Sequence, residues 1–287
     1  MFVITGITGK VGGIVADTLL KAGEPVRALA RGADRGAAWQ ARGCEIVLVP
    51  DAGDAQSLAQ AFAGAGGVFL MNPPNYDSQR GFPDIERSAK ATAEAIAKAK
   101  PRKIVFLSTV GAHVREFNLL NRSTVFEQML AATGVPVVFL RAAWFMENAA
   151  WDLASARAGR IESYLQPLDR KIDMVSTKDI GRVAADLLRE EWSGVRIIEL
   201  SGPRKYSPSD EAAGFAVALG HPVEAVEVPR AGWEQRFRKE GMQHPEARMR
   251  MLDGFNEGWI DFQREGAEHR AGSVDFAQVL KELAARA

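Results

Sequence analysis

The sequence has 287 residues, and its 36 basic and 36 acidic side chains give a formal net charge of zero, which excludes a general electrostatic attraction to nucleic acid or anionic lipid. The single cysteine, Cys44, cannot form an internal disulfide, and the four histidines lack metal-ligand spacing, so we expect no bound metal and a reducing compartment. An apolar run begins at Phe2, which leaves no room for a signal peptide, and no run approaches the roughly 18 residues of a membrane-spanning helix. We therefore expect a cytoplasmic protein with small-molecule or protein partners, no nucleic acid and no membrane.

The first half of the sequence alternates short apolar runs with helix-length amphipathic stretches. The runs lie at residues 2–5, 25–30, 45–49, 67–71, 103–107 and 135–140. Nearly continuous hydrophobicity is typical of strands covered on both faces, as in a parallel sheet. Between the runs, apolar residues recur at helical spacing, for example Val11, Val15 and Leu19. The pattern predicts an α/β fold with a Rossmann doubly wound parallel sheet.

After Arg141 the pattern changes to longer helical stretches with isolated strand-like runs. The helical stretches are 178–189, 209–219, 233–241, 245–257 and 275–286, and the strand-like runs are 195–200 and 223–228. This part predicts a smaller, mostly helical C-terminal lobe suited to binding a substrate. We divide the chain into a Rossmann domain, residues 1–148, and that lobe, residues 149–287. The segments 172–175 and 196–200 are candidates to return to the first sheet.

Three glycines, Gly6, Gly9 and Gly12, follow the first apolar run directly and open the first predicted helix. In that context glycines provide a tight turn, close approach of the backbone to a pyrophosphate and close packing of helix on strand. The helix N-terminus then faces the anion. Thr8 and Lys10 are placed to add side-chain contacts. The motif predicts an NAD(P)-binding site in residues 1–148, and the alternative is a purely structural strand-to-helix turn.

The second apolar run ends at Ala30 and is followed by Arg31. Proteins that bind NAD place an acidic residue in this region to accept hydrogen bonds from the ribose. Here a guanidinium stands where the 2′-phosphate of NADP would lie, and arginine holds phosphate in a bidentate manner. We therefore predict that NADP(H) is preferred over NAD(H), with Arg35 as a second candidate contact. The alternative is that Arg31 is a solvated loop residue.

The third and fourth runs also end in candidate cofactor residues. Asp51 and Asp54 follow the third run, where a carboxylate can accept from the adenine amino group, although Asp54 is better interpreted as the N-cap of the next helix. Met71, Asn72 and Pro73 end the fourth run, where we expect the nicotinamide ribose to pass. The proline there either serves the cofactor or only shapes the loop that runs to residue 81.

The glycine turn at 5–12, Arg31, and the segments 106–111 and 140–148 together resemble the NmrA-like branch of the atypical short-chain dehydrogenases. The similarity spans nearly the whole chain. Relatives in this branch include NAD(P)H-dependent quinone and azo-dye reductases, and regulators that bind a dinucleotide without reducing anything. The resemblance implies a set of cofactor contacts, with the adenine half and phosphates held by Gly6, Thr8, Gly9, Lys10, Val11, Gly12 and Arg31, and with Ser108, Ala143, Trp144 and Phe145 beside the nicotinamide.

The proton relay of short-chain dehydrogenases is absent. These enzymes usually carry a Tyr-x-x-x-Lys pair, in which the tyrosine donates a proton and the lysine lowers its pKa. This chain has no tyrosine between Tyr76 and Tyr164. If Glu127 matches the glutamate that follows the lysine of many NmrA-like members, the lysine position holds Ser123. No catalytic residue is therefore assigned, and His113 is either an acid or a surface loop residue.

Trp144, Phe145, Met146 and Trp151 cluster where a substrate would meet the nicotinamide, and such a wall suits a large planar apolar acceptor. We predict a substrate pocket formed by Trp144, Phe145 and Asn148. The alternative is that the cluster is core between the lobes. Core is our interpretation of the later aromatic residues, Trp233, Phe237, Phe255, Trp259 and Phe262.

Together these features predict an NADP(H)-dependent oxidoreductase that transfers hydride to a planar apolar acceptor of the quinone, azo or imine type, as a monomer or homodimer. The alternative is a non-catalytic NADP(H)-binding redox sensor of NmrA type that signals to a protein partner. The missing tyrosine and lysine favour the sensor and disfavour sugar-nucleotide epimerisation. The aromatic wall favours the enzyme.

Overall fold

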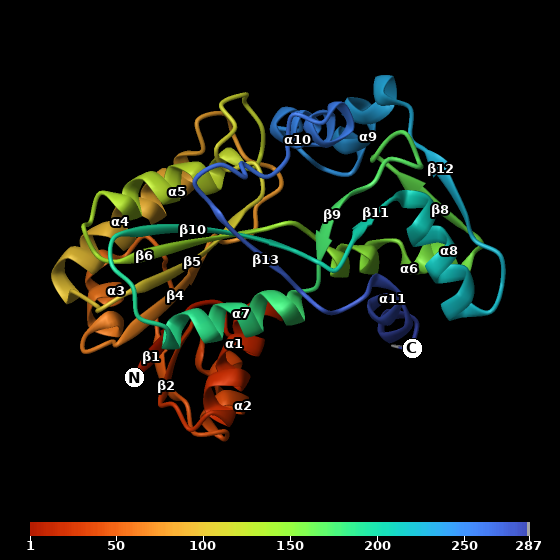
Figure 1. Cartoon of the computed structure of the whole chain (residues 1–287). Coiled ribbons are helices and arrows are strands. Elements are labelled where there is room, and N and C mark those ends of the chain that lie inside the picture. The colour runs from red at the N-terminus through yellow and green to blue at the C-terminus, as the bar shows by residue number, and fades with distance from the viewer. Residues whose placement is uncertain (286–287) are drawn as a thin grey trace.

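The computed structural model describes residues 1–285 and is built around one large parallel sheet (Figure 1). Its eight strands lie in the order β13-β10-β6-β5-β4-β1-β2-β3, and every neighbouring pair is parallel. Their bounds are β1 (Phe2–Ile4), β2 (Val26–Ala30), β3 (Glu45–Leu48), β4 (Gly67–Met71), β5 (Ile104–Thr109), β6 (Val137–Ala142), β10 (Val195–Ser201) and β13 (Glu268–Ala271). All six strands expected in the first half are present, and the predicted Rossmann α/β fold is confirmed.

Helices cover both faces of this sheet (Figure 1). One face carries α1 (Lys10–Lys21), α2 (Ala33–Gln40) and α7 (Thr177–Arg189), and the other carries α3 (Ala55–Phe62), α4 (Pro83–Ala99) and α5 (Asn121–Ala131). Helix α7 comes from the second half of the chain, yet it packs closely along α1. A Cβ on Gly181 of α7 would lie 2.5 Å from Cγ2 of Ile14 on α1, so the glycine permits this close packing.

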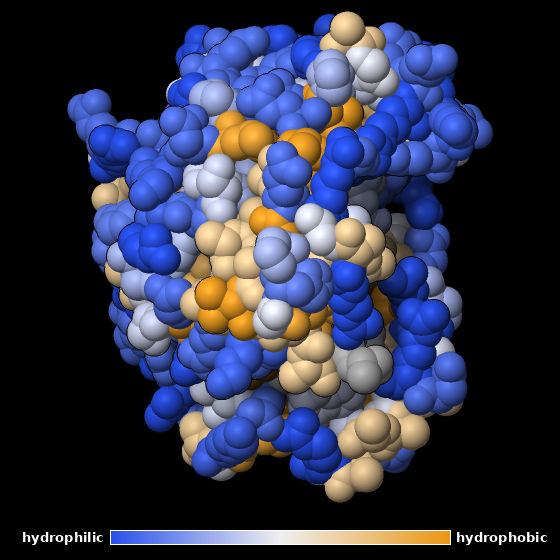
Figure 2. Space-filling model, turned by 90° about the vertical axis from the view of Figure 1, so that its right-hand side faces the viewer, coloured by the Kyte–Doolittle hydropathy of each residue, from blue (hydrophilic) through white to orange (hydrophobic). Residues whose placement is uncertain are grey.

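The C-terminal lobe lies at one end of the sheet (Figure 1). Its short strands form two small sheets, one of β11 (Lys205–Tyr206), β9 (Ile172–Val175) and β7 (Trp144–Phe145), the other of β12 (Glu224–Glu227) and β8 (Arg160–Ser163). Its helices are α6 (Leu153–Arg157), α8 (Pro208–Leu219), α9 (Trp233–Lys239), α10 (Glu246–Glu257), α11 (Phe276–Ala284), and the 3-10 turns η1 (Met146–Trp151) and η2 (Arg230–Gly232). Figure 2 views the molecule from this end and shows hydrophobic side chains across the middle of a largely hydrophilic face.

The two segments that were candidates to return to the first sheet differ from each other in the structure. The run 196–200 does return, as β10, between β6 and β13. The run 172–175 does not return, because β9 pairs with β7 and β11 in the lobe. Strand β13 was not predicted at all, since its sequence Glu-His-Arg-Ala carries no apolar run and lies at the sheet edge.

The late aromatic residues are core, as predicted. Trp233, Phe237, Phe255 and Phe262 are buried in the cluster that also contains the main sheet, and Trp259 packs against it. A second, smaller core lies between α8, α11 and η1. No helix within residues 1–285 combines the length and apolarity needed to cross a membrane.

Candidate functional site

The glycine turn connects β1 to α1 and needs glycine at two of its positions for different reasons. Gly6 adopts φ +64°, which favours glycine, and its carbonyl accepts a hydrogen bond from the N–H of Gly9 at 2.9 Å. A Cβ on Gly12 would lie 2.3 Å from the Gly6 oxygen, so only glycine lets the helix start this close to the strand. Thr8 and Gly9 are exposed, and Val11 is buried beneath the turn.

The turn therefore presents the N-terminus of a twelve-residue helix to solvent, with no side chain at Gly9 to cover it. No acidic residue lies in the first turn of α1, and Lys10 begins the helix. Main-chain N–H groups and the helix dipole favour an anion at such a place. The arrangement fits the pyrophosphate of a dinucleotide.

The end of β4 lies directly beside this turn. A Cβ on Gly6 would approach the sulfur of Met71 to 2.5 Å, so the Met71 side chain covers the turn where glycine leaves room. The next residue, Asn72, donates from Nδ2 to Oγ of Ser123 at 3.0 Å. Within the described part of the chain, Oδ1 of Asn72 is a buried acceptor without a partner. An unpaired buried acceptor is unfavourable unless a ligand or water supplies a donor, and a ribose hydroxyl would do so.

Arg122 holds the loop after β4. Its guanidinium donates to both carboxylate oxygens of Asp84, at 3.1 and 2.9 Å, and to the carbonyl of Pro73 at 3.2 Å. Burial raises the pKa of Asp84, but the hydrogen bonds from Arg122 and Asn75 outweigh that effect, so its pKa lies below the ordinary value. Arg122 thus fixes the main chain at Pro73, next to the orphan acceptor of Asn72.

Ser108 belongs to a buried polar cluster behind the site. Its hydroxyl donates to Oε1 of Glu127 at 2.5 Å, and Arg141 donates to both oxygens of Glu127, at 3.0 and 2.7 Å. Arg141 also donates to Oε1 of Gln263 at 2.8 Å. All three charged or hydroxyl groups of this cluster are buried. Because the proton of Ser108 is committed to Glu127, Ser108 is poorly placed to donate it to a substrate.

His113 follows β5 and is exposed. Partial burial of the ring and the nearby charge of Arg141 lower its pKa below the ordinary value, so the imidazole is neutral at pH 7. A neutral imidazole is a weak proton donor. The structure gives no support to His113 as the missing acid.

The segment after β6, where the aromatic wall is predicted, contains both buried and half-buried residues. Ala143 and Met146 are buried, whereas Trp144, Phe145 and Asn148 are half-buried. The ring of Trp144 meets Phe255 of α10 edge to face, with centroids 5.3 Å apart. Part of the predicted wall is therefore shared with the packing between sheet and lobe.

Glu147 is one of the residues that line a small cavity beside Lys10. It caps α7, because its carboxylate accepts from Oγ of Ser176 at 2.7 Å and from the N–H of Thr177 at 2.8 Å. Its main-chain oxygen accepts from Nζ of Lys10 at 3.2 Å. The segment that begins at Trp144 and the glycine turn are thus joined directly. Sequence reasoning missed this cap because the partners are 29 and 30 residues apart.

The candidate residues for the adenine end differ in their availability. Arg31 is exposed directly after β2, and Gly32 is the N-cap residue of α2, which has Asp34 in its first turn. Asp51 forms two hydrogen bonds with Arg87, both 2.9 Å long. Asp54 caps α3 as predicted, accepting from the N–H groups of Gln56 and Ser57. Of these side chains, Arg31 fits an anionic ligand best.

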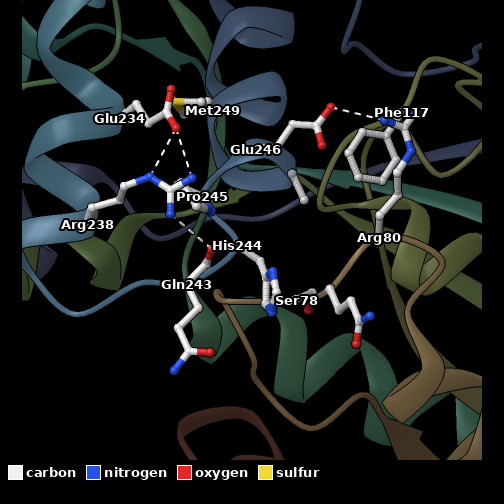
Figure 3. A pocket seen from close by; sticks show the side chains of 12 residues that line it. Ser78, Arg80, Phe117, Glu234, Arg238, Gln243, His244, Pro245, Glu246 and Met249 are labelled. Atoms are coloured by element: carbon white, nitrogen blue, oxygen red, sulfur yellow. Dashed lines mark hydrogen bonds and ion pairs between the residues drawn. The ribbon is translucent and has the colours of Figure 1, made fainter.

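A cavity of about 440 Å³ is lined in part by the loop after β4 and in part by residues 243–249 (Figure 3). Arg80 lies over the ring of Phe117 and pairs with Glu246, and Arg238 pairs with Glu234. The residues that line it include none of the predicted cofactor contacts. A smaller cavity of about 140 Å³ does adjoin the glycine turn and is lined in part by Lys10. No sequence motif had indicated the larger cavity.

The chain is similar to a family model and to several known proteins. The NmrA-like family model matches residues 1–260. The chain is 32% identical over 233 residues to (4-alkanoyl-5-oxo-2,5-dihydrofuran-3-yl)methyl phosphate reductase of Streptomyces griseus, covering 79% of this chain and 77% of that protein. It is 26% identical to the NAD(P)H azoreductase of Xenophilus azovorans over 90% of this chain and 85% of that protein.

Solved structures share the fold over the whole length. The NADPH complex of the Escherichia coli NADPH-dependent quinone oxidoreductase superposes with a TM-score of 0.81 at 22% identity, covering 99% of each chain. The NADP(H) complex of the Citrobacter sp. triphenylmethane reductase superposes with a TM-score of 0.82 at 20% identity, covering 99% of this chain and 100% of that chain.

Proposed function

The chain belongs to the NmrA-like family, and from that premise we propose that it is an NAD(P)H-dependent oxidoreductase that prefers NADPH and reduces a planar, apolar acceptor. The observation that carries the proposal is the open helix N-terminus at Gly9, with the orphan acceptor of Asn72 on the neighbouring strand end. The relatives named above are reductases of a phosphorylated furanone and of azo compounds.

The binding roles follow from the contacts of the free protein. The N–H groups at the start of α1 and the Lys10 ammonium would neutralise the pyrophosphate. Ser123 orients the Asn72 amide so that its oxygen stays available, and that oxygen would accept from a ribose hydroxyl. NADPH, when bound, supplies the hydride for the acceptor. Ser123 and Asn72 together thus take over part of the ribose anchoring that a lysine provides in related enzymes.

The preference for NADPH rests on Arg31. It is exposed beside the start of α2, so a 2′-phosphate there would meet both a guanidinium and main-chain N–H groups. Asp34 in the same helix turn opposes this, because a carboxylate repels phosphate and can accept from a ribose hydroxyl. We expect Arg31 to dominate, because it can hold phosphate with two hydrogen bonds.

The acceptor class follows from the missing Tyr-x-x-x-Lys relay of the sequence. Ser108 is bound to Glu127, and the position expected for a lysine holds Ser123. An acceptor whose reduced form carries its charge on a conjugated system can take its proton from water, whereas a simple ketone needs an enzymic acid. Trp144 and Phe145 would exclude water from one side of such a flat acceptor. The rate should therefore depend only weakly on pH between about 6 and 8.

A sensor that binds NADP(H) without reducing anything is the second candidate, favoured by the missing Tyr-x-x-x-Lys relay and by the link from Lys10 to Glu147. The two functions separate in one experiment. NADPH oxidation is followed by absorbance against a panel of quinones, azo dyes and imines, while cofactor affinity is measured by fluorescence titration. Oxidation with at least one class of planar acceptor supports the reductase. Tight NADPH binding without oxidation by any acceptor would replace the reductase with the sensor.

A further inference from the structure

Two large aromatic side chains from distant parts of the chain meet at the surface. Tyr76 is 46% exposed and Trp151 is 61% exposed. Their ring centroids are 5.7 Å apart and the ring planes are at 88°, an edge-to-face contact. Single exposed apolar residues need no explanation, but two aromatic rings that meet while both remain exposed form a surface that a flat ligand can cover.

The contact spans the two segments that flank the predicted nicotinamide position. Tyr76 lies in the loop that begins at Asn72, directly after β4. Trp151 ends η1, and that turn begins directly after Phe145. The two rings therefore connect the segment that carries the orphan acceptor with the segment that carries the aromatic wall.

Both rings project from main chain that is held in place. On the Tyr76 side, the carboxylate of Asp77 accepts from the main-chain N–H groups of Gln243 and His244, and Arg122 holds the carbonyl of Pro73. On the Trp151 side, the Glu147 carboxylate is bound to the start of α7. Each anchor fixes the loop without using either ring. The rings are thus prepared for a ligand at little cost in conformational entropy.

We propose that Tyr76 and Trp151 form the outer binding surface for the acceptor and select acceptors with extended fused rings over single rings. The inference rests on the proposed reductase function and names the feature of the acceptor that this chain recognises. An acceptor that packs against the exposed parts of the two rings gains contact in proportion to its own ring area. A single-ring acceptor covers little of that surface, whereas a fused three-ring acceptor covers most of it.

The test compares Tyr76→Ala and Trp151→Ala with the parent protein, using 1,4-benzoquinone, 1,4-naphthoquinone and 9,10-phenanthrenequinone. We expect KM for the three-ring quinone to rise about tenfold in each variant, KM for the one-ring quinone to change less than about twofold, and NADPH affinity to stay the same. Trp151→Phe and Tyr76→Phe should recover most of the difference. Val217→Ala, at a residue of α8 that is 85% exposed, is the matched surface control.

A second readout does not depend on turnover. Binding of 9,10-phenanthrenequinone to the cofactor-free protein is measured by equilibrium dialysis, and it should weaken about tenfold in both alanine variants but not in Val217→Ala. If the parent binds this quinone but reduces nothing, the reductase proposal fails while the binding surface stands. An equal change of KM for all ring sizes, or unchanged binding of the three-ring quinone in both alanine variants, would overturn the inference.

Discussion

The Nζ atom of Lys10 donates to the main-chain oxygen of Glu147 at 3.2 Å, so the first residue of α1 holds the segment that carries the predicted aromatic wall. The carboxylate of the same glutamate caps α7. One lysine therefore binds the segment that contains Glu147 and also lies beside the predicted pyrophosphate position. Any loss of its charge should be felt at both.

The first prediction concerns that lysine. Lys10→Met keeps the length of the side chain but removes the donor, and we expect NADPH to bind about threefold to tenfold more weakly. The melting temperature should barely change, because Lys10 is exposed. Lys21→Met, at the other end of the same helix, is the matched control and should leave affinity unchanged. Equal affinities for Lys10→Met and the parent would show that Lys10 serves only Glu147.

The second prediction concerns the choice of cofactor. Arg31→Ala should weaken NADPH about tenfold and leave NADH nearly unchanged, because only NADPH carries the 2′-phosphate. Arg102→Ala removes an exposed arginine that precedes β5, at the amino end of the parallel strands, and should affect neither cofactor. Dissociation constants for both cofactors decide the matter. A similar loss for NADPH and NADH would assign Arg31 a structural role.

The third prediction concerns the close approach at Gly12. In Gly12→Ala the new methyl would overlap the Gly6 oxygen, which is main chain and cannot move aside cheaply. We expect loss of NADPH binding and a free energy of unfolding lower by about 1–3 kcal/mol. Gly232→Ala is the control, since within residues 1–285 nothing lies within 4 Å of its added Cβ and its φ is negative. A Gly12→Ala protein that binds NADPH normally would refute this site.

The fourth prediction concerns the half-buried pair of Asp152 and Glu211. Burial raises the pKa of Asp152 to about 6, and burial together with the neighbouring Asp152 carboxylate raises the pKa of Glu211 well above its ordinary value. In the described residues, Oε1 of Glu211 is also without a hydrogen-bond partner. The folded state thus favours the protonated form of the two carboxyl groups. The contribution of this preference to the free energy of unfolding is present near pH 4 and is lost as the pH rises through about 6.

Glu211→Gln removes one of the two titrating groups while keeping the shape of the side chain. The parent should lose about 1–3 kcal/mol of stability between pH 5 and pH 8 relative to this variant. Urea unfolding of both proteins at the two pH values gives the comparison. A stability difference that stays constant with pH would mean that the pair does not titrate in this range.

The fifth prediction concerns the Ser108 cluster. Glu127→Ala would leave the Arg141 guanidinium buried without its carboxylate, which should lower the free energy of unfolding by about 3–5 kcal/mol. Glu45→Ala also breaks an ion pair, with Arg27, but Glu45 is exposed, so its effect should stay below about 1 kcal/mol. Denaturant unfolding of the two variants measures this contrast. Similar losses would mean that water reaches the Arg141 site.

The sequence predicted the sheet well because strands covered on both faces leave continuous apolar runs, and β1 to β6 all carry one. It failed at β13, whose charged residues lie at a sheet edge, and at β9, whose short run pairs within the lobe. The glycine turn was recognisable because three glycines act locally. The roles of Asp51, Glu147 and Ser108 were not, since their partners Arg87, Thr177 and Glu127 are distant in sequence.

The packing of α7 on α1 has a consequence for protein synthesis. The glycine turn leaves the ribosome early, but α7, which covers the helix that begins at that turn, emerges only after most of the sheet. Until then Ile14 faces solvent, and Glu147 has no Thr177 to cap. A nascent chain that ends before α7 therefore contains the glycine turn but lacks the helix that packs against α1. Tight cofactor binding should begin only once the second half of the chain has folded back onto the first.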